Sequence, residues 1–333
     1  MAVKKNKIEL PIFEPIYGAY HYQGCGTAFL ESNPSIINWY LNEVLNLSCT
    51  LKFLSGFTSP EINISNSSWK CNPYLDKKWY EMQFVDGYIH YVIRNLIDND
   101  YYVYFNGIDD FYVDGKSDFG EKHFSHDGCI CGYNQTEKTY CIYAYDQNWL
   151  YKKFWAPQKN FDKGRRALFK EGEFGYICGI KPQQDVVVFS FQKSLEKIAE
   201  YLSVEKDYFN KEKIHGIIVH NFIAQYLDML YNGSVPYEKL DRRIFRLIWE
   251  HKKVMLTRIL LIEQELKLDG SIGKEYETVV READTCRMLY ASHHMKRRDS
   301  VLPIIKKKLL TLKSLEQDLL EKLLTKAKGA NTP

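Results

Sequence analysis

The period of the hydrophobic pattern changes once along this chain, and that change limits the folds it can adopt. Up to about Pro182, short runs with apolar residues at every second position are mixed with helical spacing. After Phe191, nearly every segment has apolar residues three and four positions apart. We therefore predict an α+β fold: a domain at 1–185 with a small antiparallel sheet, followed by an α-helical domain at 186–333.

The second half contains the usual start and stop signals of helices. Ser194 is a candidate N-cap for the first of them. Breaks fall at Asn232-Gly233, at Asp269-Gly270 and at 299–303, where Gly and Pro interrupt the helical pattern. This spacing predicts a bundle of four or five helices.

Composition excludes several classes of protein. The 333 residues are 45% hydrophobic, enough for a real core, and the net charge of +3 is too small to indicate nucleic-acid binding. The basic start at 1–13 is not followed by a long apolar stretch, so it is not a signal peptide. No run approaches the roughly 18 apolar residues of a membrane span. We expect a cytoplasmic protein that uses no membrane.

The eight cysteines do not have the spacing of a structural zinc site, because no CxxC pair occurs. In a cytosolic chain we expect them to be reduced. Cys129 and Cys131 fall on one face of a predicted strand, as buried thiols. We predict no metal site. The acidic residues at 109–118 lack the spacing of a calcium loop, and we interpret them as a solvated loop.

The clearest local motif is a hairpin that begins at His126 and ends at Asp146. One alternating run leads from His126 to Gly132-Tyr133, a polar turn follows, and a second alternating run leads from Thr139 to Asp146. Antiparallel pairing places the start of the first strand beside the end of the second. We therefore expect Asp146 to lie beside His126, where a carboxylate would fix the tautomer of the imidazole.

Cys25 is the candidate nucleophile for such a pair. It stands between two glycines in QGCGTAFL, which we interpret as the first turn of a helix. The free N–H groups and dipole of a helix N-terminus favour a thiolate, and a nearby imidazolium lowers the pKa of the thiol further. The same N–H groups would stabilise an oxyanion. Cys25, His126 and Asp146 together then form a triad for acyl chemistry.

These motifs, in this order, resemble the papain-like cysteine enzymes over roughly residues 20–180. Gln23-Gly-Cys25-Gly resembles the segment around that family's nucleophile, and His126 precedes Gly132-Tyr133 as its histidine strand does. The run that ends in Asp146-Gln-Asn-Trp149 is similar to its Asn-Ser-Trp strand, with Asp in place of Asn. The resemblance implies a papain-like fold, with Gln23 as a candidate oxyanion donor and Trp149 as a shield for the His–Asp pair.

A short first half and a helical second half are similar to a biosynthetic branch of that family, which includes the butirosin-pathway acyltransferase and the closthioamide amide synthetase. This resemblance implies acyl transfer from a carrier-protein thioester to a small amine, forming an amide in natural-product biosynthesis. Cys25 would carry the acyl group, His126 would act as the base and Asp146 would orient it. The partners would be an acyl or peptidyl carrier protein and the amine. Apart from the carrier's phosphopantetheine, no cofactor is implied.

Each residue also has an ordinary structural interpretation. Cys25 fits a buried small hydrophobe, His126 a residue at a strand end and Asp146 a turn or cap residue. His123 is the rival base, and Ser125 is a poor rival nucleophile because it is adjacent to His126.

Tyr20 and Trp149 are candidate pocket residues, although aromatic residues of this kind also serve as core or surface. The alternatives to acyl transfer are a cysteine peptidase or amidase with the same triad, and a non-catalytic helical scaffold with a degenerate papain-like module. The basic stretch from Lys296 to Lys313 is a candidate docking surface for an acidic carrier protein, or a solvated helix face.

Overall fold

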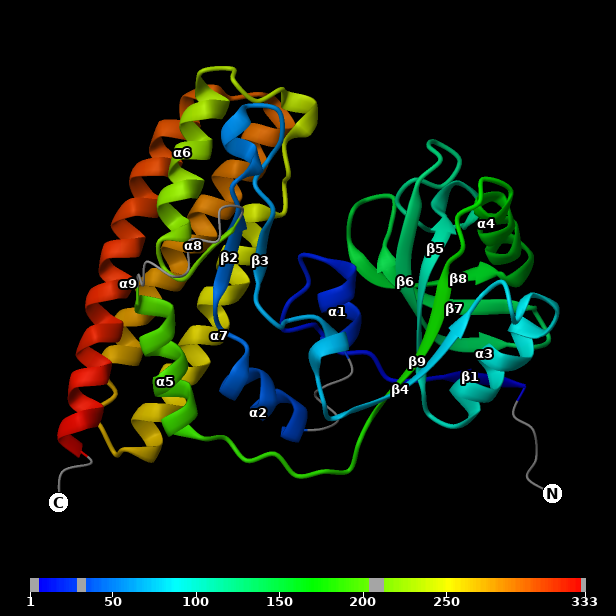
Figure 1. Cartoon of the computed structure of the whole chain (residues 1–333), viewed down its shortest axis with the longest axis horizontal. Coiled ribbons are helices and arrows are strands. Elements are labelled where there is room, and N and C mark those ends of the chain that lie inside the picture. The colour runs from blue at the N-terminus through cyan, green and yellow to red at the C-terminus, as the bar shows by residue number, and fades with distance from the viewer. Residues whose placement is uncertain (1–5, 29–33, 204–212, 331–333) are drawn as a thin grey trace. The chain divides into compact units, whose positions relative to one another are not determined.

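A computed structural model of the chain describes residues 6–28, 34–203 and 213–330. The chain divides into two compact units, and each contains two separate stretches of sequence. Unit 1 is formed by Met1–Ile36 and Ser68–Val186, and unit 2 by Ile37–Ser67 and Val187–Pro333 (Figure 1). The fold is α+β with an antiparallel sheet, as predicted. The change near residue 186 lies where the sequence pattern placed it, but residues 37–67 belong with the helical part instead of the first domain.

Unit 1 is built on a seven-stranded antiparallel sheet with the order β4-β9-β5-β6-β7-β8, in which β1 also pairs with β6. Its strands are β1 (Lys7–Glu9), β4 (Leu75–Glu81), β5 (Tyr102–Asp109), β6 (Ser125–Asn134), β7 (Thr139–Tyr145), β8 (Tyr151–Pro157) and β9 (Tyr176–Pro182). Strands β5, β6, β7 and β9 are buried over most of their length, so both faces of the sheet are covered.

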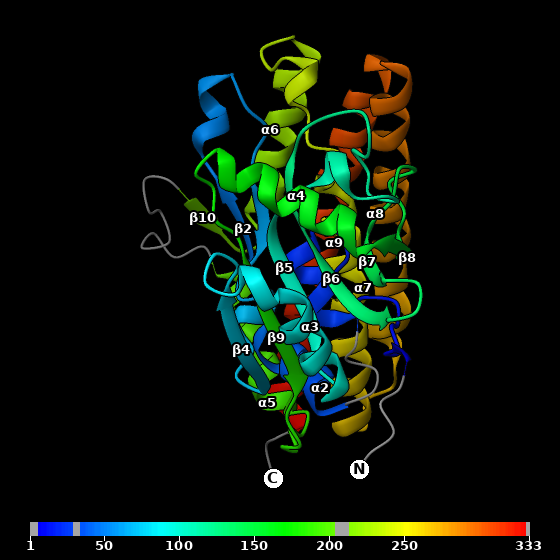
Figure 2. The ribbon, with the colours of Figure 1, turned by 90° about the vertical axis from the view of Figure 1, so that its right-hand side faces the viewer.

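Helices lie on the two faces of this sheet. In the described part of unit 1 they are α1 (His21–Thr27), α3 (Ile89–Asp98) and α4 (Gln158–Lys170). Figure 1 shows α1 on one face and α3 and α4 on the other, and Figure 2 shows α3 and α4 in front of the strands. The ring of Phe161 from α4 packs edge-on against Phe105 of β5, with ring centroids 5.4 Å apart. The polar cluster described below lies at the sheet ends of β5 and β6.

The predicted hairpin is present as β6 and β7. Cys129 pairs with Tyr143 and Ile130 with Ile142, and a bulge shifts the register before Gly132 pairs with Cys141. The short 3-10 helices η3 (Trp69–Cys71) and η5 (Asp110–Tyr112) complete the surroundings of the cluster.

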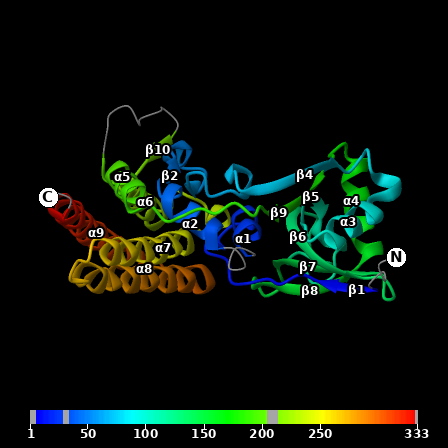
Figure 3. The ribbon, with the colours of Figure 1, turned by 90° about the horizontal axis from the view of Figure 1, so that it is seen from below.

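Unit 2 consists mainly of helices, which confirms the helical character predicted for the C-terminal part. They are α5 (Phe191–Leu202), α6 (Val219–Tyr231), α7 (Ile244–Glu265), α8 (Ser271–Lys296) and α9 (Leu302–Ala330). Figure 3 shows α7 and α8 side by side. Unit 2 also contains a three-stranded sheet with the order β10-β2-β3. Its strands are β2 (Leu47–Thr50), β3 (Ile62–Ile64) and β10 (Lys213–His215).

Helix α2 (Pro34–Glu43) and helix α7 are tied together by one buried arginine of unit 2. Arg258 donates hydrogen bonds to the backbone oxygens of Leu41, Tyr40 and Val44, at the C-terminal end of α2. This arrangement satisfies carbonyl groups that a helix end leaves without partners.

Among the described residues, no helix is both long enough and apolar enough to cross a bilayer.

Candidate functional site

Six polar side chains gather at one end of the unit 1 sheet, and we refer to them as the His–Asp cluster. They come from α1, from β5, from the loop that begins at η5 and from β6. The members of the cluster are His21, Tyr104, Asp110, Lys116, His126 and Asp127. Most of them are buried. Among the histidine, carboxylate and lysine side chains, His126 is the most exposed, with 21% of its side chain accessible.

His126 has one nitrogen held by a carboxylate and one that is not hydrogen-bonded. Nδ1 lies 2.8 Å from Asp110 Oδ2, and Asp110 is fully buried. Because that carboxylate accepts, Nδ1 carries the proton and the lone pair is on Nε2. Among the described residues, the polar neighbour of Nε2 is Asp127 Oδ1 at 3.8 Å, which is beyond hydrogen-bond range. An imidazole in this state is ready to accept a proton at Nε2.

Asp110 is held in place by a second buried charge. Lys116 Nζ lies 3.1 Å from Asp110 Oδ1 and donates to the backbone oxygen of Asp127 at 2.6 Å. The Lys116 side chain is fully buried, and its ammonium lies 5.6 Å from the ring centre of Phe105. The Asp110 carboxylate therefore lies between Lys116 Nζ at one oxygen and His126 Nδ1 at the other.

The second histidine has both nitrogens engaged. The backbone N–H of Tyr145 donates to His21 Nε2 at 3.0 Å, so the proton of the ring is on Nδ1, which donates to Asp127 Oδ1 at 2.7 Å. Burial lowers the pKa of His21 to about 4, against the opposing effect of Asp127. His21 is therefore neutral at neutral pH. Its ring lies against that of His126, with centroids 4.3 Å apart.

Asp127, whose side chain is 13% exposed, is a carboxylate that accepts hydrogen bonds on both oxygens. Besides His21, Tyr104 donates its hydroxyl to Asp127 Oδ2 at 2.5 Å. Burial by itself would raise the pKa of Asp127, but His21, His126 and Tyr104 together hold it below its ordinary range. The ionised carboxylate lies beside His126 Nε2, where it would stabilise the imidazolium that forms when this nitrogen takes a proton.

The predicted partner of His126 is wrong. Asp146 accepts from the backbone N–H groups of Asn148 and Leu150 and pairs with Lys152 at 2.7 Å. Burial opposes ionisation of Asp146, but Lys152 and the two N–H groups outweigh it and lower its pKa. The β6–β7 ladder ends at Cys129 and Tyr143, so the strands do not continue far enough to join the two predicted residues. Asp110 takes the place assigned to Asp146.

The predicted surroundings of Cys25 are also wrong. It is the fifth residue of α1 instead of the first turn, and its side chain is fully buried. Burial raises the pKa of its thiol, with Cys129 as a hydrogen-bond partner that acts in the opposite direction. The flanking glycines serve close packing, because a Cβ on Gly24 would lie 2.5 Å from Tyr151 Cε1 and one on Gly26 would overlap Trp69. Cys25 as acyl carrier stays a prediction.

The remaining predicted site residues lie around α1 and the β7–β8 turn. Gln23 is buried within α1, and the ring of Tyr20 stacks on that of Tyr22 with centroids 5.4 Å apart. Trp149 is 43% exposed and lies near Tyr145, with ring centroids 6.5 Å apart. The last two residues of the predicted nucleophile segment QGCGTAFL, 29 and 30, lie outside the described residues.

His123, the rival base, forms a pair of its own with Asp109. Its Nδ1 lies 2.7 Å from Asp109 Oδ2, and its ring stacks on Phe111 with centroids 4.3 Å apart. Both carboxylates are buried, but the side chain of His123 is 64% exposed, whereas that of His126 is 21% exposed. The two pairs thus have the same chemistry in different surroundings.

Sequence reasoning missed most of the cluster. Asp109 and Asp110 are buried, although their loop was expected to be solvated. The signal that was available is that they follow directly on a strand of buried apolar residues, at a sheet end. His21 and Asp127 stand next to residues that were singled out, but their pairing depends on the packing of α1 against β6, which no local pattern reveals.

Two groups of side chains at the cluster have ligand atoms close enough to hold a metal: His21, His126 and Asp127, and also Asp110 and His126 with neighbouring Asp118. The hydrogen bonds do not suit a metal. His21 Nδ1 carries a proton because the N–H of Tyr145 occupies Nε2, and Asp110 is already paired with Lys116. We therefore assign no metal to these residues.

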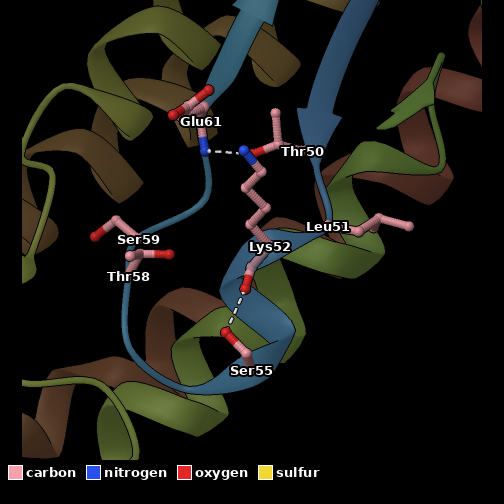
Figure 4. A pocket seen from close by; sticks show the side chains of 7 residues that line it. All are labelled: Thr50, Leu51, Lys52, Ser55, Thr58, Ser59 and Glu61. Atoms are coloured by element: carbon pink, nitrogen blue, oxygen red, sulfur yellow. Dashed lines mark hydrogen bonds between the residues drawn. The ribbon is translucent and has the colours of Figure 1, made fainter. Parts of the chain in front are cut away.

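Unit 2 has an open pocket on the connection between β2 and β3 (Figure 4). It is lined by Thr50, Leu51, Lys52, Ser55, Thr58, Ser59 and Glu61. Several of its hydroxyls are used to hold the loop: Thr50 accepts from the N–H of Glu61, and Ser55 donates to the backbone oxygen of Lys52. We assign no function to this pocket.

Comparison with known proteins leaves the function to be argued from the site. Neither a protein-family model nor a curated protein matches this chain. The hydrogen bonds of the His–Asp cluster are therefore the main basis for assigning chemistry.

Proposed function

We propose that the protein transfers an acyl group from a carrier-protein thioester to a small amine, with His126 as general base and Asp110 as the residue that orients it. The observation that carries the proposal is the hydrogen bond between His126 Nδ1 and buried Asp110, which leaves Nε2 able to accept a proton. The acyl donor and the amine are supported by the resemblance of the sequence to papain-like biosynthetic enzymes.

The proposed chemistry is a proton transfer coupled to acyl transfer. The amine nitrogen attacks the thioester carbonyl carbon, and Nε2 of His126 takes a proton from that nitrogen. Asp110 at Nδ1 and Asp127 beside Nε2 stabilise the imidazolium, which then protonates the departing thiolate. An amide bond forms, the carbon–sulfur bond breaks and the base returns to its starting state.

The covalent route through Cys25 is part of the prediction from sequence. It needs the thiol to become accessible to the acyl group, because the side chain is fully buried in this structure and its pKa is raised. A Cys25→Ala variant that is inactive, together with an acyl adduct on Cys25 in the intact mass of the wild type, would establish that route.

The test uses a small thioester surrogate and a diamine, with the amide measured by mass spectrometry. We expect wild type to form the amide and His126→Asn to lose activity by about 10²- to 10⁴-fold, the usual contribution of a general base. His123→Asn is the matched control, because His123 has the same kind of carboxylate partner but its own ring is exposed. Equal losses in both variants, or no amide from the wild type, would contradict the proposal, and release of free acid would indicate a hydrolase.

The carrier protein is proposed to bind the basic stretch from Lys296 to Lys313. Two of its lysines already have acidic partners, since Lys306 pairs with Asp228 and Lys308 with Glu282. Exposed Arg298 and Lys307 are better positions for charge reversal. We expect Arg298→Glu with Lys307→Glu to weaken turnover of the carrier-bound donor and to spare the small thioester. Equal loss with both donors would rule out this surface.

A further inference from the structure

Two cysteines on neighbouring strands of unit 1 touch each other at the bulge of the hairpin. Cys131 of β6 and Cys141 of β7 have their sulfur atoms 3.5 Å apart. The register shifts between Ile130 and Gly132, so the extra residue of the bulge is Cys131. Both thiols are buried and free. A disulfide needs a sulfur–sulfur distance of about 2.05 Å, so only a small movement separates this contact from a bond.

The two thiols have different acidities. The hydrogen bond from Cys131 lowers the pKa of Cys141, and nearby Lys153 and Lys7 act in the same direction. The pKa of Cys131 is raised well above its ordinary value, first by its role as donor to Cys141 and then by burial. Cys141 is therefore the nucleophilic sulfur of the pair, and Cys131 is the thiol that can resolve an oxidised Cys141.

The other cysteines of unit 1 do not combine a close sulfur–sulfur contact with a lowered thiol pKa. Cys25 and Cys129 also interact, but both have raised pKa values because of burial, so neither provides a thiolate. Cys178 is buried as well, and its pKa is raised to about 12. Cys71 is exposed.

We propose that Cys131 and Cys141 are a reversible dithiol–disulfide site whose oxidant is a small hydroperoxide. Both sulfurs are buried between paired strands, which favours a small oxidant over a bulky disulfide reagent. The site is independent of the acyl chemistry proposed above. Closing it ties β6 to β7, and β6 carries His126 and Asp127 at its other end.

The chemistry balances in two steps. The Cys141 thiolate attacks the terminal oxygen of the hydroperoxide, the O–O bond breaks, and a sulfenic acid and an alkoxide form. The alkoxide takes a proton and leaves as the alcohol. The Cys131 thiol then attacks the sulfenic sulfur, the S–S bond forms and water leaves. Two thiols are oxidised by two electrons and the hydroperoxide is reduced. A dithiol reductant reverses the step by exchange.

The test uses the full chain with Cys71→Ser, which removes the exposed thiol. After treatment with hydrogen peroxide, we expect peptide mass spectrometry to find the Cys131–Cys141 cross-linked peptide and to lose it after reduction with dithiothreitol. Cys131→Ser should stop at a sulfenic acid on Cys141, which dimedone traps. In Cys141→Ser, both the cross-link and the trapped adduct should be absent. Cys178→Ser, a buried substitution elsewhere in the sheet, should leave the cross-link unchanged.

The outcomes distinguish this site from general thiol oxidation. A cross-link between Cys25 and Cys129, or dimedone adducts spread over all buried cysteines, would overturn the proposal. So would a wild-type pair that stays reduced while denatured protein is fully oxidised under the same conditions. Cys141→Ser and Cys131→Ser are both small changes in side-chain size, so we expect each variant to keep the fold. Circular dichroism of each variant checks this.

Discussion

At the scale of single residues, the two histidines of the cluster have different roles. His21 is buried, neutral and hydrogen-bonded at both nitrogens, so it positions Asp127. His126 is partly exposed and has Nε2 available. A base and a positioning group thus stand with their rings in contact. The sequence could suggest that His126 matters, because it begins an alternating run, but it could not identify Asp110, which reaches His126 from η5 after β5.

The pKa of His21 predicts a pH dependence of stability. It is about 4 in the folded protein and about 6.5 in an unfolded chain, so the unfolded state binds the proton more tightly. Stability is therefore full above the unfolded value and falls as the pH drops from about 6.5 towards 4. We expect the loss between pH 7 and pH 5 to be smaller in His21→Gln than in wild type, by about 2 kcal/mol.

The measurement is the free energy of unfolding in urea at pH 7 and at pH 5, in wild type and in His21→Gln. Both proteins must be measured, because His220 and His251 are also buried with lowered pKa values and contribute to the slope of stability against pH in each. The difference between the two slopes isolates His21. Identical slopes would show that His21 is already protonated in the folded state or is unchanged by folding.

At the scale of elements, α1 owes its position to its two glycines. Tyr151 packs over Gly24, and its ring stacks on that of His21 with centroids 5.3 Å apart. We expect Gly24→Ala to lower the free energy of unfolding by about 1–3 kcal/mol, because a methyl group there overlaps a buried ring. Thermal unfolding followed by circular dichroism measures it. Gly87→Ala, which meets no atom within 4 Å, is the control and should change little. Equal effects would contradict this packing.

The strands and helices themselves were largely readable from sequence, since the β6–β7 hairpin and the C-terminal helices follow their hydrophobic periods. The role of the glycines in QGCG could not be read from the sequence. Glycines beside a cysteine fit both an exposed helix start and a tightly packed helix, and only the contacts with Tyr151 and Trp69 decide between them. The bulge at Cys131 could not be predicted either. It depends on the pairing of β6 with three other strands, β1, β5 and β7, and no local pattern encodes that pairing.

At the scale of the whole molecule, unit 2 is completed by a segment from the first part of the chain. Residues 37–67 supply β2, the central strand of its sheet, and the carbonyl groups bound by buried Arg258. Sequence pattern placed the boundary at 185–186 and could not detect this insertion, because short strands have no distinct period in a helical unit.

This arrangement predicts that residues 187–333 alone do not form a stable fold. Without residues 37–67 the buried Arg258 guanidinium loses three backbone acceptors, which costs several kcal/mol, and β10 loses its neighbouring strand. We expect the fragment to show no cooperative thermal transition by circular dichroism. Adding a peptide of residues 37–67 should restore one. A cooperative transition of the fragment by itself would contradict the assignment of 37–67 to unit 2.

The role of His126 as the base can be tested by its tautomer, read from ¹⁵N-labelled histidine by NMR in wild type and Asp110→Asn. We expect neutral His126 to carry its proton on Nδ1 in wild type, and we expect this preference to weaken when Asp110 is replaced, since the carboxylate acceptor is lost. A proton on Nε2 in the wild type would contradict this role, because that nitrogen could not then act as the base.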